Sequence, residues 1–315
     1  MPQRKLLVAA LASVVLSSLV AASSAQATAP LRPPTIGGCQ VFPSNNAWNR
    51  DVSKLPVRRD SARLVSSISS TGGRTMLHAD FGGGGAYGIP FMVVQSTQKA
   101  EPIHYTAYGD ESSPGPFPIP PGAPVEGGAS SSGDRHVLVV QQRSCHLYEL
   151  YNARWRGNRW DAASGVNWNL KSNKLRTLGF TSADAAGLPI FPGLARYSEV
   201  ASGAIHHALR FTVAKTQRGY ILPATHEASS STNPALPPMG LRLRLKANYP
   251  LARFHGESLV ILRALKQYGM IVADNGGSWF ISGAVSTRWN DDDLNQLKTV
   301  PGAAFEAVNT GPIHH

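Results

Sequence analysis

Carboxylates and histidines gather in a few short segments of this sequence, each bounded by glycine or other turn residues. Glu149 is the sharpest candidate, because it stands mid-strand in CHLYELY, on the same face as Leu147 and Tyr151. Burial on such a face raises the pKa of a carboxyl group and suits it to donate a proton. The alternative is an exposed glutamate on the wet face of an edge strand.

Hydrolysis of a glycosidic bond needs a second carboxyl group, about 5 to 9.5 Å from the first. The candidates are Asp80 in LHADFG, Asp134 in GDRH and Asp184 in TSADAAGLPIFPG. His136 and His207 end otherwise apolar strand faces, where the mouth of a cavity would lie, so we add them to the catalytic candidates. Each of these side chains could instead be a hydrogen-bonded core or rim residue.

Tryptophans and arginines alternate in RWRGNRWDAASGVNWN, which contains Trp155, Trp160 and Trp168. Exposed tryptophan stacks on sugar rings, and neighbouring arginine pairs with carboxylates. With Arg210 and His226, these tryptophans are the substrate-binding candidates. The alternative is a cluster of core or hairpin tryptophans.

Other catalytic chemistries have weaker signals. The dispersed histidines and aspartates could supply nitrogen and oxygen ligands, but the sequence has no HExxH or similar helical pair. We therefore assign no metal ligand and no cofactor, and leave a metal requirement open. The G-x-S-x-G turn of a serine nucleophile is absent as well.

The N-terminal 27 residues have the pattern of a cleavable secretory signal. Arg4 and Lys5 precede an apolar run, and Ala-Gln-Ala at 25–27 forms the cleavage site. The apolar run has about 15 residues, whereas a membrane span needs about 20. We expect a secreted, extracellular protein with no transmembrane segment in the mature chain, which would begin with a Pro-rich tether at 28–38.

Two cysteines, Cys39 and Cys145, are the only ones in the chain. An exported protein has no glutathione pool to keep them reduced, so we predict one disulfide. It would stabilise the fold by roughly 3 to 5 kcal/mol.

The formal net charge of +11 favours anionic partners. Outside the cell these would be an acidic polysaccharide, another envelope polymer or a membrane surface. The cations are scattered, and the one dense run, LRLRLK at 241–246, alternates as a half-buried strand does. We therefore expect a polysaccharide as partner, with an anionic one among the candidates, and no nucleic acid.

Strand-like segments separated by Pro/Gly/Ser-rich turns dominate the rest of the chain. Helices are predicted at 60–69, at 257–268 with Gly269 as its C-cap, and at 292–298. A β-hairpin is predicted to turn at Asn275-Gly276. The fold class is mainly β: a single β-sandwich or jelly-roll-like domain over 39–315 with two or three accessory helices. Strands are predicted at 89–95, 103–107, 136–141, 146–151, 204–214, 220–224 and 241–247.

Many short motifs resemble those of a family of secreted bacterial proteins, found in actinobacteria among others. They include NAWNRDVS, LHADFG, PIPPGAPVEGG, GDRHVLVV, ADAAGLPIFPGL, LPPMG and YGMIVADNG. The resemblance covers about 39–308 and implies export and a single domain. It supplies no activity and no catalytic residue.

The residues favour a secreted carbohydrate-active enzyme, a glycosidase that hydrolyses a polysaccharide with Glu149 and one of Asp80, Asp134 or Asp184. A variant is a polysaccharide lyase, in which a histidine or tyrosine removes the proton beside a uronate carboxylate that Arg210 or a metal neutralises. The alternative from another class is a non-catalytic cell-envelope or glycan-binding protein.

Overall fold

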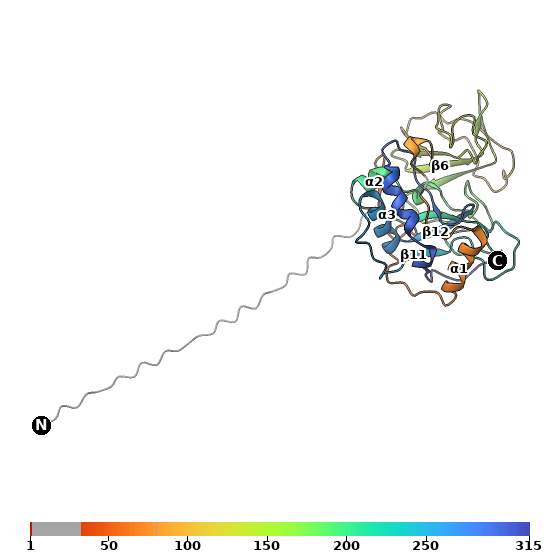
Figure 1. Ribbon diagram of the computed structural model, residues 1–315. Coiled ribbons are helices and arrows are strands. Elements are labelled where there is room, and N and C mark those ends of the chain that lie inside the picture. Colours follow the sequence, from red (N-terminus) through yellow and green to blue (C-terminus); the bar gives the residue numbers. More distant parts are fainter. Residues whose placement is uncertain (2–32, 80) are drawn as a thin grey trace. The chain divides into compact units, whose positions relative to one another are not determined.

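Strands predominate in this chain, at 24% of its residues against 17% in helices. The computed structural model describes Met1 and residues 33–79 and 81–315, and residues 33–315 belong to one compact unit (Figure 1). The predicted signal peptide and Asp80 lie outside the described residues. The prediction of a mainly-β fold with few helices is confirmed.

A five-stranded mixed sheet forms the centre of the larger hydrophobic core. Strands β10 and β12 run parallel to each other, and the remaining pairs are antiparallel. In the order in which they lie side by side, the strands are β13 (Phe280–Ile281), β10 (Leu209–Val213), β12 (Met270–Asn275), β11 (Arg242–Leu245) and β14 (Phe305–Ala307).

Three smaller sheets complete the strands. In the four-stranded sheet, β3 and β5 are parallel and the other pairs antiparallel, so the sandwich or jelly-roll detail of the prediction is not confirmed. The four-stranded sheet contains β3 (Phe91–Val94), β5 (Val137–Gln141), β6 (His146–Tyr151) and β9 (Ser164–Asn169). The others contain β4 (Ile103–Tyr105), β8 (Trp160–Ala162) and β7 (Arg154–Trp155), and β1 (Thr35–Ile36) with β2 (Cys39–Gln40).

Strand β5 is buried on both faces and thereby joins two cores. Leu138 and Val140 face the larger core, whereas Val137 and Val139 face a smaller one shared with the three-stranded sheet. This alternation follows from the period of two residues along a strand. In Figure 1, β6, the neighbour of β5, lies in the upper part of the unit, apart from β11 and β12.

The predicted helices are present. Helix α1 contacts β14 and α3 contacts β11, and α3 ends before Gly269, whose φ of 67° is the left-handed conformation that favours glycine. The helices are α1 (Ser61–Gly72), the short α2 (Tyr197–Ala201), α3 (Gly256–Gln267) and α4 (Asp291–Leu294), with 3-10 turns at Gly83–Gly85, Phe191–Gly193, Asn295–Thr299 and Gly302–Ala304.

Two local predictions are wrong. Strands β12 and β13 do not form a hairpin at Asn275-Gly276, because β10 lies between them and pairs with both. The segment 220–224 is not a strand: Tyr220 makes single bridges to two segments, and Pro223 has no N–H for a ladder.

The predicted disulfide between Cys39 and Cys145 is present, with 5.3 Å between the two Cα atoms. It joins β2 to the residue before β6 and closes a loop of 106 residues. Among the described residues, no helix has the length and hydrophobicity that crossing a bilayer requires.

Candidate functional site

The buried guanidinium of Arg210 on β10 holds the centre of a polar cluster. Its Nε and Nη2 donate to the two carboxylate oxygens of Asp184, at 3.0 and 2.7 Å, and its Nη1 donates to Ser282 Oγ at 2.6 Å. The Oδ2 atom of Asp274 lies 3.8 Å from Nη2. A bidentate arginine–carboxylate pair of this kind fixes both the position and the orientation of the arginine.

The parallel pairing of β10 and β12 places Asp274 beside this arginine. Thr212 on β10 lies opposite Asp274, after an irregularity in the register, so Asp274 is near the carboxyl end of β12. Asp184 reaches the same place from a loop that Ser182 ties together, because its hydroxyl donates to Leu188 O and accepts from the Asp184 N–H.

The environment of Asp274 favours its protonated form. Burial and the negative charge of Asp184 raise the pKa of Asp274 to about 7, although the charge of Arg210 acts in the opposite direction. The side chain is still 26% exposed. Asp274 can therefore hold a proton near neutral pH at a position that solvent reaches.

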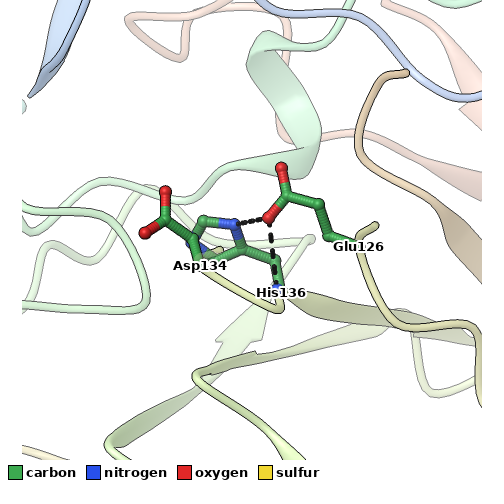
Figure 2. Close-up of side chains that lie close together, drawn as sticks. All are labelled: Glu126, Asp134 and His136. Carbon is green, nitrogen blue, oxygen red and sulfur yellow. Dashed lines mark hydrogen bonds and ion pairs between the residues drawn. The ribbon is translucent and has the colours of Figure 1, made fainter. Parts of the chain in front are cut away.

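His136, the residue before β5, forms the second half of the cluster. Figure 2 shows its ring nitrogen directed at Glu126, with the Asp134 carboxylate on the far side of the ring. The distance from Nδ1 to Glu126 Oε2 is 2.6 Å, and Nε2 lies 3.0 Å from the carbonyl oxygen of Ala183, next to Asp184. Both neighbours accept hydrogen bonds, so both ring nitrogens carry hydrogen and the ring is an imidazolium.

The pKa shifts agree with an ion pair between these two residues. Burial lowers the pKa of His136, but the hydrogen bond and charge of Glu126 more than offset this and leave it raised. Burial alone would raise the pKa of Glu126. The hydrogen bond and the charge of His136 outweigh burial, so the pKa of Glu126 is lowered. Glu126 is therefore ionised at neutral pH.

Electrostatic coupling joins the two halves. The charge of Arg210 lowers the pKa of both Glu126 and His136, and the charge of His136 lowers that of Asp274. The ring of Tyr151 lies 5.7 Å from that of His136 in a tilted arrangement, and burial followed by the charges of Asp134 and Asp274 raises the pKa of Tyr151. We call these seven residues the Arg210 cluster: Glu126, Asp134, His136, Tyr151, Asp184, Arg210 and Asp274.

The donor set Glu126, Asp134 and His136 has the spacing of a metal site, since one ligand atom from each lies within 4.8 Å of the others. The imidazole does not fit this use, because Nε2 faces a carbonyl oxygen and Nδ1 donates to Glu126. A metal would have to displace the proton from Nδ1 and break the ion pair.

Glu149 is buried in the core and is not hydrogen-bonded to any residue of the cluster, although the charge of Asp184 acts on its pKa. It has no exposed surface and accepts from three N–H groups: Trp168 Nε1 at 3.0 Å, Ile190 at 3.0 Å and Phe191 at 2.8 Å. Burial raises its pKa to about 7 despite these hydrogen bonds. Glu149 is therefore buried, as the sequence predicts. Its hydrogen bonds, however, hold the segment that carries Ile190 and Phe191 in place.

The two remaining histidine candidates have structural contacts. His207 is buried beside Arg196 and Glu199, with its Nδ1 donating to Ala208 O at 2.7 Å. His226 is half-buried and donates to Ala185 O at 2.7 Å, which supports the loop that carries Asp184.

One of the three tryptophan candidates reaches the surface. Trp160 and Trp168 are buried at 1% and 8% exposure, and their indole N–H groups donate to Ile119 O and to Glu149. Trp155 is half-buried and, with Arg154, lines a hollow of about 620 Å³. The other wall of this hollow is the segment 121–129, which carries Glu126.

Of the predicted site residues, the structure brings together Asp134, His136, Asp184 and Arg210. The sequence reasoning missed Glu126, Asp274 and the role of Tyr151. Asp274 had a usable signal, because the apolar run MIVA ends in Asp-Asn-Gly, and polar groups at carboxyl ends of parallel strands commonly line sites. Glu126 had none, because it lies in an irregular segment 10 residues before His136.

No family model, curated protein or solved structure matches this chain. What the chain does must therefore be inferred from the chemistry of its own side chains.

Proposed function

We propose that this chain is a secreted carbohydrate-active enzyme that hydrolyses a polysaccharide at the Arg210 cluster. The observation that carries this proposal is a pair of accessible carboxyl groups whose charges both act on Tyr151: Asp274, with a raised pKa, and the exposed Asp134. Glycosidases use one protonated and one ionised carboxyl group, and their environments keep the two apart in pKa.

Each carboxyl group has a role in this mechanism. Asp274 protonates the oxygen of the departing sugar, and Asp134 acts on the anomeric carbon directly or through a water molecule. No hydrogen bond or ion pair of the Asp134 side chain is found within 33–79 and 81–315, so it is free for this role. The Glu126–His136 ion pair and the Asp184–Arg210 pair hold the surrounding charges in place.

The hollow beside Trp155 supports a glycan as substrate. An indole face in a hollow can stack on a sugar ring, and the guanidinium of Arg154 adds positive charge. Arg154 makes no side-chain ion pair within the described part of the chain, whereas Arg156 is paired with Asp161 at 2.9 Å. The positive charge of Arg154, unpaired within the described residues, favours an acidic polysaccharide in this hollow.

The test is hydrolysis of a panel of acidic and neutral polysaccharides, read by new reducing ends. We expect Asp274→Asn and Asp134→Asn to lower the rate by about 10² to 10⁴, the usual contribution of a general acid or base. Asp292→Asn, which changes an exposed carboxylate on α4, is the matched control and should keep full activity. Full activity of both cluster variants would exclude this mechanism.

A lyase is less well supported by the arrangement of charges. Lyase chemistry would need Arg210 to neutralise the uronate carboxylate of the substrate, but that guanidinium is already occupied by Asp184 and Ser282. Ultraviolet absorbance of unsaturated uronates in the same panel would identify a lyase.

A non-catalytic glycan-binding protein is supported by a specific observation, because the Trp155 hollow needs no catalytic group to bind a sugar. Retention on immobilised glycan that is lost in Trp155→Ala, without new reducing ends from any substrate, would identify this function.

A further inference from the structure

A second cavity, of about 290 Å³, lies at the other end of the central sheet. Its walls include Ile271, near the start of β12, whereas Asp274 of the Arg210 cluster is near the end of that strand. Arg242, at the start of β11 and paired with Ile271, also lines it. This volume is far larger than the roughly 15 Å³ that a single water needs.

Arg242 is a buried cation without an acidic partner. It is 3% exposed, and its guanidinium donates to three backbone carbonyls: Tyr268 O at 2.7 Å, Ala47 O at 2.8 Å and Arg50 O at 3.2 Å. No carboxylate of the described residues lies within ion-pair distance of it. A guanidinium has five N–H groups, so two remain for another acceptor.

The other buried arginines of the large sheet differ in this respect. Arg210 is paired with Asp184 at 2.7 Å. Arg244, two residues after Arg242 on β11, is paired with Glu306 at 2.8 Å. A buried charge without a counter-charge is costly, so an anion in the cavity would be favoured.

A second cation increases this demand. Arg50 is exposed at the edge of the cavity, and burial, followed by the charge of Arg50, lowers the pKa of Arg242 to about 9. The guanidinium is therefore still charged at neutral pH. Two like charges around one hollow are favourable only where a negative charge can lie between them.

An unsatisfied hydroxyl is an independent sign of a ligand. Thr310 Oγ1 is buried, lines the same cavity and has no hydrogen-bond partner within the described residues. Buried polar atoms nearly always have a partner, and a molecule bound in the cavity would supply one. Leu175, Leu222 and Pro223 form an apolar wall for the carbon part of such a molecule.

We propose that this cavity is a binding site for a small organic anion, whose carboxylate or sulfate lies between Arg242 and Arg50 and accepts from Thr310. The site is separate from the Arg210 cluster and does not depend on the function proposed for it. An acidic sugar and a free inorganic oxyanion share the required chemistry, and the neutral sugar lacks it.

The test is titration calorimetry of the full, disulfide-bonded protein with sulfate, glucuronate and glucose. We expect binding of sulfate and glucuronate and none of glucose. Tighter binding of glucuronate than of sulfate would mean that the apolar wall contributes to affinity. Binding of sulfate alone would restrict the site to inorganic oxyanions and overturn the organic part of the proposal. Absence of binding by either anion at millimolar concentration would overturn all of it.

Variants keep the test independent of folding. Arg242→Gln removes three hydrogen bonds to backbone carbonyls and can unfold the chain, so Arg50→Gln and Thr310→Val carry the test. We expect each to weaken anion binding at least fivefold. Arg263→Gln removes the same charge from an exposed position on α3 and should leave binding unchanged. Equal weakening in Arg263→Gln and Arg50→Gln would mean a diffuse charge effect and would overturn the site.

Discussion

At the scale of single residues, the protonation of Asp274 has a consequence for stability. Its folded pKa of about 7 lies above the ordinary value of 3.8, so between these pH values the folded state holds a proton that the unfolded state has lost. The contribution of Asp274 to the free energy of unfolding therefore falls as pH rises from about 4 to about 7.

Asp274→Asn should remove this dependence. We expect the variant to gain roughly 4 kcal/mol relative to the natural protein between pH 4 and pH 8. Urea unfolding of both proteins at the two pH values measures it. The remaining dependence from Glu149 is common to both proteins and cancels in the comparison. A difference that does not change with pH would contradict the raised pKa.

Glu149→Gln separates a structural from a catalytic carboxylate. The amide would place its NH₂ group against N–H donors that now meet the carboxylate, so we expect a loss of roughly 2 kcal/mol in the free energy of unfolding. The hydrolysis rate per folded molecule should stay within about twofold, because the side chain has no exposed surface. The opposite outcome, normal stability with activity lost, would restore Glu149 as the proton donor.

At the scale of elements, Arg135 organises the segment between Glu126 and Asp134. Its guanidinium donates to Ala153 O at 3.1 Å and to the carbonyl oxygens of residues 128, 129 and 131. One buried side chain, two residues before β5, thereby holds the segment that joins the two cluster carboxylates.

Arg135→Met should loosen this segment. We expect amide hydrogen exchange over 127–134 to accelerate about tenfold or more, since several hydrogen bonds to the backbone are lost. Mass spectrometry of the exchanged protein measures it. Arg154→Met is the control, and an unchanged rate in Arg135→Met would mean that the segment is ordered by its own backbone.

Most helices and strands could be predicted from the sequence, but the pairing of the strands in the sheets could not. The period of 3.6 residues identified α1 and α3, and alternation identified β6, because these patterns depend on local side-chain direction. The supposed hairpin at Asn275-Gly276 failed because β10, about 60 residues earlier, pairs between β12 and β13. No local pattern encodes a partner at that distance.

The same limit explains the site. Asp134, His136, Asp184 and Arg210 were recognisable as polar residues beside apolar strands. Their grouping depends on a parallel crossover and on an ion pair between β10 and a loop 26 residues earlier. Glu149 was recognised as a desolvated carboxylate, but the N–H donors that occupy it come from residues about 40 positions later.

At the scale of the whole molecule, the disulfide sets the stability of the folded unit. It closes a loop of 106 residues, so we expect the double variant Cys39→Ser/Cys145→Ser to lose about 3 to 5 kcal/mol in the free energy of unfolding. Urea titration measures the loss. A reducing agent should destabilise the natural protein by a similar amount and leave the double variant unaffected; equal stability of all samples would contradict this role.

The long separation of Cys39 and Cys145 also bears on the order of events during synthesis. A chain emerges from its N-terminus at about 5 to 20 residues per second, so the thiol of Cys39 waits on the order of 10 s for its partner. During this interval no disulfide links β2 to the strands that follow. The nascent protein therefore exposes a thiol that can attack the disulfide of an oxidising catalyst, or another disulfide, before its own partner is made.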